Sequence, residues 1–380
     1  MPEMERADNM KKMLLIVPSL HQGGSEKVCA ATAVVLKPYF DVRIAIFDSR
    51  NIDFDVEDVS VADLGLPSRP GKLAKVFNVC RRGWRLYCLK KREKIDIAYS
   101  MGPTANLANV FSRMLPGGKG AKCWLGVMSY MDMDSSWLGL FCKKADRLLC
   151  CSETLRGMIE KKFACSCTYT LTGFFDIPQI QARAAEEEAS LPWKDGRVIV
   201  SMGREDVVKG FWHLLKIFSL VHRELPDTRL LIIGKGEFTA YRKLAADLGV
   251  ADAVHFAGLQ KNPYPYLKRG TLYLLTSYWE GFPNALVEAM ALGLPAVATD
   301  CMTGPAEIFD GKYGVLVPNM GKEPDMDASH IEEEEKSTAA RVTALLRDEE
   351  ELARYSRLSV ERAGVFSKEA YIQKIREWSE

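Results

Sequence analysis

Short apolar runs alternate with amphipathic stretches along most of the chain. In the first half, the apolar runs predict strands at residues 13–18, 42–47, 95–100, 122–127 and 147–151, and the first amphipathic stretch predicts a helix at 25–36. In the second half, strands are predicted at 198–202, 229–233, 253–256, 272–276, 295–299 and 315–317, with helices at 211–224 and 238–248. This alternation is typical of α/β folds, and it predicts two doubly wound, Rossmann-like domains with parallel sheets.

The length and the charge distribution both indicate two domains. The chain has 380 residues, which suits two domains of average size. Residues 1–173 hold 26 Lys and Arg against 18 Asp and Glu, a net charge of +8, whereas residues 174–380 hold 25 against 32, a net of −7. We therefore expect one domain at 1–173 that prefers an anionic partner and a second at 174–365. Between them, residues 181–190 predict a surface helix. The acidic residues 323–335 predict a solvated loop or a helix start, and the favoured interpretation is a surface insertion without chemistry.

Several classes of protein do not fit the sequence. No apolar run approaches the roughly 18 residues of a membrane-spanning helix, and residues 1–12 lack the apolar middle of a signal peptide, so we expect a cytoplasmic protein. The ten cysteines include no CxxC pair, and the Cys150-Cys151 and Cys165-Ser-Cys167 clusters do not have zinc-site spacing. We expect reduced cysteines that act as small apolar side chains.

Two loops that follow predicted strands carry candidate phosphate-binding groups. Gly23 and Gly24 open the first helix and allow close approach of an anion, but no GxGxxG pattern is present, which disfavours a dehydrogenase. In the second half, Gly203 is followed by Arg204 and Lys209 in a strand-to-helix loop. An arginine fork and a lysine point charge at this spacing suit the grip of a diphosphate.

Two glutamates flank a predicted helix start in the second half. Pro283 or Asn284 begins the helix, so Glu280 lies in the loop before it and Glu288 lies about one turn inside it. We expect the free amides of residues 284–286 to form an anion site at the helix N-terminus. One carboxylate can then bind sugar hydroxyls and the other ribose hydroxyls, at opposite ends of the phosphate.

Residues 280–288 resemble the E-x7-E motif of the GT4 family of retaining glycosyltransferases, which have the GT-B fold. The resemblance extends over nearly the whole chain through four further segments and a closing helix. These are the family's GG-x-E turn at 23–26, its GR…KG segment at 203–210, its strand end at 231–236, its GhLV segment at 314–317, and a final helix at 366–380 that packs back on the first domain.

The resemblance implies roles for individual residues. Arg204, Lys209 and Glu280 are the implied catalytic residues, the first two as a diphosphate clamp and Glu280 against the donor sugar. The implied donor-binding residues, with Glu288 on the ribose, are Gly23, Gly24, Gly203, Gly234, Leu259, Phe282, Pro283, Asn284, Ala285, Leu286 and Glu288. No metal and no cofactor are implied, and the Asp132-Met-Asp134 pair only resembles the DxD metal motif of a different fold. A histidine that many relatives carry near the reacting sugar is missing at residues 128–132. Either His21 occupies nearby space or no histidine is needed, and the resemblance leaves both open.

The first domain is expected to choose the acceptor. Residues 72–94 hold nine Lys or Arg and one Glu, with Leu73, Val76, Phe77, Cys80, Trp84 and Tyr87 at helical spacing. This helix either lies on an anionic membrane surface as a peripheral contact or packs its apolar stripe against the sheet, and the sequence leaves both open. No nucleic-acid motif accompanies the charge.

The sequence thus predicts a metal-independent, retaining glycosyltransferase. Its expected donor is a nucleotide-sugar, and the resemblance favours a UDP-sugar. Its expected acceptor is a glycan or a lipid-linked molecule in surface polysaccharide synthesis. A catalytically silent nucleotide-sugar-binding subunit and a nucleotide-sugar epimerase of the same fold are the alternatives.

Overall fold

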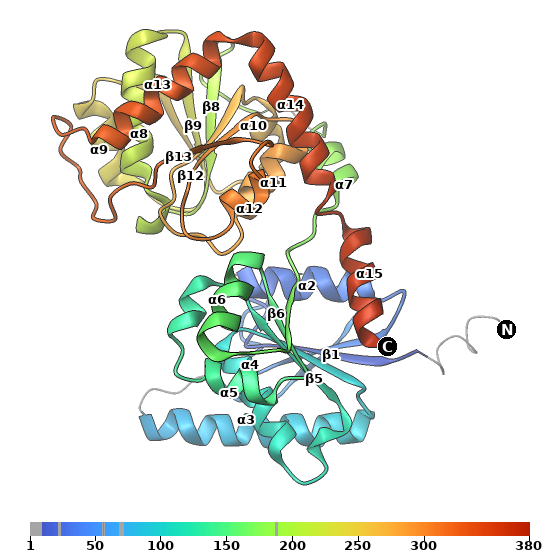
Figure 1. The fold of residues 1–380 in the computed structure, drawn as a ribbon. Coiled ribbons are helices and arrows are strands. Elements are labelled where there is room, and N and C mark those ends of the chain that lie inside the picture. Colours follow the sequence, from blue (N-terminus) through green and yellow to red (C-terminus); the bar gives the residue numbers. More distant parts are fainter. Residues whose placement is uncertain (1–9, 22–23, 55, 57, 68–71, 187–188) are drawn as a thin grey trace. The chain divides into compact units, whose positions relative to one another are not determined.

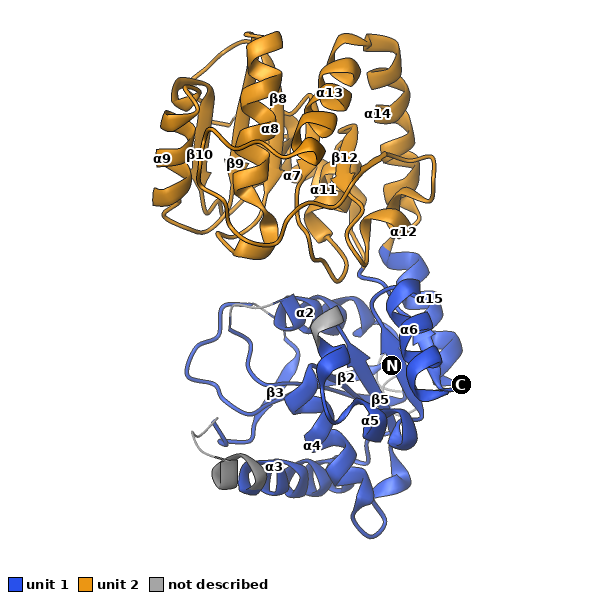
Figure 2. Cartoon of the chain, turned by 60° about the vertical axis from the view of Figure 1, so that its left-hand side comes forward, with its two compact units in different colours: residues 1–173, 368–380 blue, residues 174–367 orange. Residues whose placement is uncertain are grey.

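The computed structural model describes residues 10–380 except 22–23, 55, 57, 68–71 and 187–188. The chain divides into two compact units (Figure 2). Unit 1 comprises Met1–Gly173 together with Lys368–Glu380, and unit 2 comprises Phe174–Ser367.

Unit 1 is built on a seven-stranded sheet in the order β3-β2-β1-β4-β5-β6-β7, and every neighbouring pair of strands is parallel. Its strands are β1 (Lys12–Val17), β2 (Asp41–Ile46), β3 (Ser60–Asp63), β4 (Ile97–Met101), β5 (Lys122–Val127), β6 (Arg147–Cys150) and β7 (Thr168–Thr170). Its helices are α2 (Gly24–Leu36), α3 (Lys72–Glu93), α4 (Pro103–Met114), α5 (Leu138–Lys144), α6 (Glu153–Phe163) and α15 (Lys368–Ser379), with 3-10 turns η1 (Gly118–Gly120) and η2 (Tyr130–Asp134).

Helices cover both faces of this sheet, with α3 and α4 on one face and α2 on the other (Figure 1). The chain's last helix, α15, belongs to unit 1 although the whole of unit 2 precedes it. Lys11 Nζ and Lys122 Nζ each donate to the Ser379 carbonyl at 2.8 Å, where cations suit a helix C-terminus. The predicted return of the closing helix to the first domain is confirmed.

Unit 2 is built on a six-stranded parallel sheet in the order β10-β9-β8-β11-β12-β13. Its strands are β8 (Arg197–Met202), β9 (Thr228–Ile233), β10 (Val254–Gly258), β11 (Leu272–Leu275), β12 (Ala296–Thr299) and β13 (Val315–Val317). Its helices are α7 (Ile177–Arg183), α8 (Phe211–Glu224), α9 (Thr239–Asp247), α10 (Tyr264–Lys268), α11 (Asn284–Ala291), α12 (Pro305–Phe309), α13 (Glu333–Arg347) and α14 (Glu349–Gly364), with 3-10 turns η3 (Val207–Lys209) and η4 (Ala251–Ala253).

Two apolar cores fill the two faces of this sheet, because successive side chains of a strand point to opposite faces. Ile199 of β8 packs in the core that contains α8, whereas its neighbours Val198 and Val200 pack in the core that contains α11. The predicted α/β class with two Rossmann-like parallel-sheet domains is confirmed. The sequence did not predict the edge strands β3 and β7.

The helix predicted at residues 181–190 is wrong in its position. A helix does form, but it is α7, which starts after Asp176, whose side chain accepts from the Gln179 amide, and which ends at Arg183. The Asn262 side-chain amide donates to the Arg183 carbonyl at 2.8 Å and satisfies it outside the helix. An alanine- and glutamate-rich composition favoured a longer helix than these end contacts allow.

Candidate active site

The loops after β8 and β11 bring two of the predicted catalytic residues, Lys209 and Glu280, together. These two strands are neighbours, and the chain passes from β8 to β9 on one side and later returns to β11 on the other. The order of the strands therefore reverses at β8. In open parallel sheets, ligands bind at the carboxyl ends of the strands at such a switch point.

Two glycines allow these loops to lie close together. Gly210 follows η3 with a φ of +60°, and a β-carbon on it would lie 2.4 Å from the Thr276 carbonyl oxygen. A β-carbon on Gly234, after β9, would lie 1.8 Å from the Gly203 carbonyl oxygen. Side chains at these positions would force the loops apart, so Gly234 shapes the site through its close approach to Gly203.

Lys209 and Glu280 form an ion pair at this edge of the sheet. Lys209 Nζ lies 2.7 Å from Glu280 Oε1, and the Ser277 hydroxyl donates to the same oxygen at 2.7 Å. The side chains of Lys209 and Glu280 are only 20% and 10% exposed. The aliphatic part of Lys209 packs on Gly203, where a β-carbon would lie 3.1 Å from Lys209 Cε. Partial burial strengthens the attraction between the two charges compared with a pair in open solvent.

The backbone of Glu280 is also fixed. The Thr303 hydroxyl donates to its carbonyl, and Gly304, with a φ of +97°, packs against the Pro283 ring, so that a β-carbon there would lie 2.5 Å from Pro283 Cδ. The loop after β12 therefore holds the loop that carries Glu280. A fixed carboxylate and ammonium are suited to bind a polar substrate without reorganisation.

Arg204 is placed differently from Lys209. Its side chain is 72% exposed, and its guanidinium contacts Asp206, with Nη2 2.8 Å from Oδ2 and Nε donating to Oδ2 at 3.0 Å. Asp206 also accepts from the Val208 amide and caps η3. The two predicted clamp cations thus contact different carboxylates, and an exposed arginine with a neighbouring aspartate is free to change its rotamer.

Glu288 lies on α11 and is buried. The Tyr264 hydroxyl lies 3.5 Å from Glu288 Oε1. Burial raises the pKa of Tyr264, and the negative charge of Glu288 raises it further. Burial also raises the pKa of Tyr273 on β11, and Glu280 and then Glu288 add to this effect. Both phenols therefore stay neutral beside the two glutamates, and neither tyrosine was named in the sequence analysis.

The start of α11 is close to the predicted position, but one predicted amide is not free. The helix begins at Asn284 with Pro283 as its N-cap residue, and the Leu286 N–H donates to the Pro283 carbonyl at 3.0 Å. This bond closes the first turn of the helix, so Leu286 offers neither its amide nor its fully buried side chain. Within the part of the chain that the structure describes, the amides of Asn284 and Ala285 show no backbone partner.

The remaining predicted donor-binding residues are spread over the two units. Phe282 is partly buried against Phe366, with ring centroids 5.3 Å apart, while Leu259, just after β10, is 70% exposed. In unit 1, Gly24 is the exposed first residue of α2. Gly23 lies outside the described residues.

The two minor candidates of unit 1 have local contacts. Asp132 Oδ2 accepts from the amides of Met128 and Ser129 at 3.0 and 3.2 Å, which makes it a turn-capping carboxylate. Burial raises its pKa. His21 Nδ1 lies 2.6 Å from Asp53 Oδ2.

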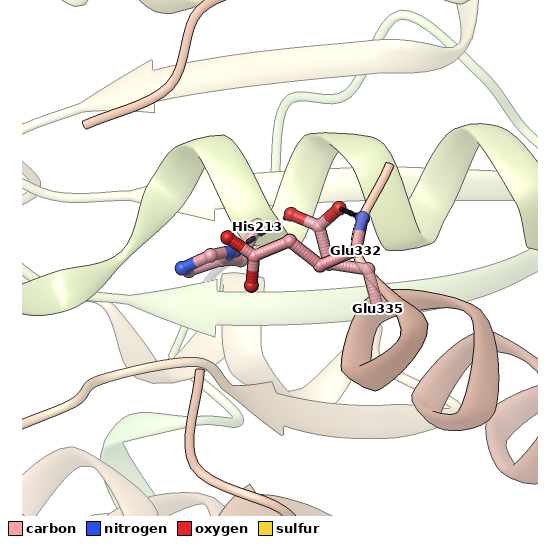
Figure 3. A group of neighbouring side chains, drawn as sticks. All are labelled: His213, Glu332 and Glu335. Carbon is pink, nitrogen blue, oxygen red and sulfur yellow. Dashed lines mark hydrogen bonds and ion pairs between the residues drawn. The ribbon is translucent and has the colours of Figure 1, made fainter. Parts of the chain in front are cut away.

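Among the described residues, one group of three side chains has the spacing of a metal site: His213, Glu332 and Glu335 (Figure 3). His213 Nδ1 lies 2.6 Å from Glu335 Oε1, and Nε2 lies 2.8 Å from the Gly321 carbonyl oxygen. Glu332 and Glu335 form the reciprocal capping box at the start of α13. Because both ring nitrogens face protein acceptors, these contacts account for the group without an ion. The apolar run 211–218, interrupted by His213 and Lys216, was the sequence signal for these two buried polar residues.

The comparisons with known proteins support a family assignment. Residues 183–358 match the family model of the glycosyl transferases group 1, and this range contains Arg204, Lys209, Glu280 and Glu288. The chain therefore carries a group 1 glycosyltransferase domain. The predicted family resemblance is confirmed.

Two relatives and one solved structure illustrate the likeness. An uncharacterized glycosyltransferase of Methanocaldococcus jannaschii is 31% identical over 261 residues, which is 63% of each chain. The N-acetylgalactosamine-N,N'-diacetylbacillosaminyl-diphospho-undecaprenol 4-alpha-N-acetylgalactosaminyltransferase of Campylobacter jejuni is 26% identical over 81% of this chain and 86% of its own. The Anabaena protein HepE, solved with UDP and glucose, matches 97% of this chain and 99% of its own with a TM-score of 0.75 and 18% identity. This last likeness supports the GT-B fold.

Proposed function

We propose that the protein is a retaining glycosyltransferase that moves a sugar from a UDP-sugar to a glycan or lipid-linked acceptor in surface polysaccharide synthesis. The observation that carries the proposal is the fixed Lys209–Glu280 pair at the switch point of unit 2, within the range of the group 1 match. The UDP and glucose of the Anabaena structure and the lipid diphosphate in the name of the Campylobacter relative favour these two substrates.

In the proposed reaction, the bond between the sugar's anomeric carbon and the donor phosphate breaks, and the acceptor oxygen bonds to that carbon on the same face. The acceptor's proton passes to an oxygen of the leaving diphosphate, so no protein base is required. Lys209 and Arg204 balance the negative charge that grows on the diphosphate. Glu280 then contacts the transferring sugar, and Glu288 holds the ribose.

We propose that this charge balance operates without a metal ion, since Lys209, Arg204 and the start of α11 supply positive charge. We also propose that the protein acts in the cytoplasm, at the inner face of the cell membrane where a lipid-linked acceptor is exposed. None of the described helices has the length and apolarity to cross a bilayer.

The test is turnover measured with a panel of nucleotide-sugars, with and without acceptor. Lys209→Ala should lower kcat by on the order of a hundredfold because charge stabilisation in the transition state is lost, and Lys209→Arg should restore part of it. Lys268→Ala, a change of an exposed lysine on α10, is the matched control. Glu280→Ala should lower kcat more than it raises the donor KM, whereas Glu288→Ala should mainly raise KM.

The outcomes separate the alternatives. A silent binding subunit would bind a nucleotide-sugar but release no sugar, and an epimerase would convert the donor without an acceptor. Activity that is lost in EDTA and restored by Mn²⁺ would contradict metal independence. Near-normal turnover of Lys209→Ala would remove the Lys209–Glu280 pair from the mechanism.

A further inference from the structure

Helix α3 exposes two of its aromatic side chains, Phe77 and Trp84, to solvent. Phe77 is 61% exposed and Trp84 is 57% exposed, and both lie on one stripe with Arg81, Cys88 and Lys91 at spacings of three and four residues. Such spacing places side chains on one face of a helix. Of the two alternatives that the sequence leaves open for this helix, packing of the apolar stripe against the sheet does not hold for Phe77 and Trp84.

The opposite face of α3 attaches the helix to unit 1 through polar groups as well as leucines. Arg82 is buried, donates to the Leu66 carbonyl from Nε and Nη2, and lies over the Phe47 ring at 4.4 Å. Lys90 is buried and donates to Asn109 Oδ1 and Ser112 Oγ. Because these contacts fix the helix, the exposed aromatic residues are not required for its attachment.

A basic cavity adjoins the same helix, between α4 and the turn η1. It has a volume of about 430 Å³ and is lined by Arg113, Met114, Leu115, Pro116, Gly117, Lys119 and Lys144, with no acidic residue among them. Met114 is 57% exposed. Among the described residues, Lys119 and Lys144 have no ion-pair partner, whereas Arg113 is paired with Asp146 at 2.5 Å.

Two contacts join the cavity to the exposed face of α3. The Tyr87 hydroxyl donates to the Pro116 carbonyl at 2.7 Å, and the Tyr87 ring lies 5.6 Å from the Trp84 ring. Lys91 Nζ lies 3.2 Å from the position that a β-carbon would take on Gly117. The aromatic stripe and the cavity therefore form one continuous surface, with Lys91 where they meet.

We propose that this surface binds an anionic bilayer, with the phosphate of a phospholipid headgroup in the cavity and with Phe77 and Trp84 at the lipid interface. Aromatic residues beside lysines are typical of membrane-surface contacts. Lys91, Lys119 and Lys144 each favour an anionic surface by about fivefold in affinity. A second copy of this chain would present the same positive charge to these lysines, which disfavours a dimer here.

The proposed membrane contact rests on the proposed function in one respect: the function supplies the reason for it, because a lipid-linked acceptor lies in a bilayer. Its test needs no sugar transfer: the whole protein is floated with vesicles of phosphatidylcholine, with or without phosphatidylglycerol. Conversely, turnover with a soluble acceptor needs no vesicles. The vesicle experiment can therefore refute the membrane contact, and the turnover experiment can refute the proposed function, each without affecting the other.

The decisive comparison is between two charge-reversed variants. Lys119→Glu with Lys144→Glu alters the cavity, and Lys161→Glu with Lys268→Glu changes the net charge equally at exposed lysines of α6 and α10. We expect binding to phosphatidylglycerol vesicles to fall at least tenfold in the cavity variant and less than threefold in the control. Binding should shift the tryptophan fluorescence emission to shorter wavelength, and this shift should be absent in Trp84→Phe.

Three results would overturn the proposal. Equal losses in the two variants would mean that only net charge matters. Complete displacement of vesicles by millimolar inorganic phosphate would identify a site for free phosphate. A dimer in light scattering that Trp84→Ser abolishes would mean that a second copy covers this face.

Discussion

Helix α3 follows strand β3 in unit 1, and helix α8 follows strand β8 in unit 2. Both helices bury charged or polar side chains, but the partners of these side chains differ. In α8, His213 and Lys216 are fully buried and face carboxylates: Glu335 lies 2.6 Å from His213, and Asp325 lies 2.7 Å from Lys216. In α3, the buried Lys90 donates hydrogen bonds to the neutral side chains of Asn109 and Ser112.

The difference shows what the acidic residues 323–335 do. The sequence predicted a solvated loop or a helix start there and favoured a surface insertion without chemistry. A helix does start in this segment, at Glu333, but Asp325 and Glu335 also contact the buried Lys216 and His213 of α8. Lys216 and further hydrogen bonds hold the pKa of Asp325 well below its usual range. Among the described residues, no carboxylate pairs with Lys90, and burial, together with the nearby positive charge of Arg113, lowers its pKa to about 8. A buried cation keeps its charge where a carboxylate compensates it.

The largest effect is expected from the breaking of the His213–Glu335 pair. Glu335→Ala removes the carboxylate that pairs with the buried His213, and it should lower the free energy of unfolding by about 3–5 kcal/mol. Glu334→Ala, at the exposed neighbouring position on α13, is the control and should change it by less than about 0.5 kcal/mol. Urea denaturation of both variants measures the difference. If Glu335→Ala is as stable as Glu334→Ala, the acidic segment does not fix α8.

A smaller, pH-dependent effect is expected at Lys90. Its folded pKa of about 8 lies below the unfolded value near 10.4, so between these values the unfolded chain binds more protons. By linkage, the free energy of unfolding should rise with pH across this window, by at most about 3 kcal/mol. The penalty for a buried charge is fully present below pH 8. Denaturation of the wild type and of Lys90→Met from pH 7 to 10 isolates this effect, and a constant difference between them would contradict the assignment.

Much of the fold could be predicted because strands leave a local signal. The runs that form β1, β5, β8 and β11 are continuous and apolar, since both faces of a parallel sheet are covered. β3 and β7 have only four and three residues at the two edges of the sheet, and in β3 none of the four is buried. Such short edge strands carry little pattern for a prediction to use.

The candidate site was predictable in its parts but not in its contacts. The spacing of Glu280 and Glu288 around a helix start is local, and α11 begins where expected. The contact between Lys209 and Glu280 joins residues 71 positions apart, and that of His213 with Glu335 joins residues 122 apart. Such pairings depend on which strands are neighbours, which one sequence does not reveal. The sequence left the orientation of α3 open for a related reason, because Arg82 finds its acceptor in the Leu66 carbonyl, 16 residues away.

The smallest effect on stability is expected from the exposed face of α3, and it completes the comparison with α8. Phe77→Ser with Trp84→Ser should change the free energy of unfolding by less than about 0.5 kcal/mol per residue, since neither side chain fills a core. Leu86→Ala, at a fully buried position of the same helix, should cost about 2–5 kcal/mol. Thermal melts of the two variants and the wild type give the comparison. A loss in the double serine variant comparable to that of Leu86→Ala would mean that the aromatic side chains hold the fold together, and α3 would then be an ordinary structural helix like α8.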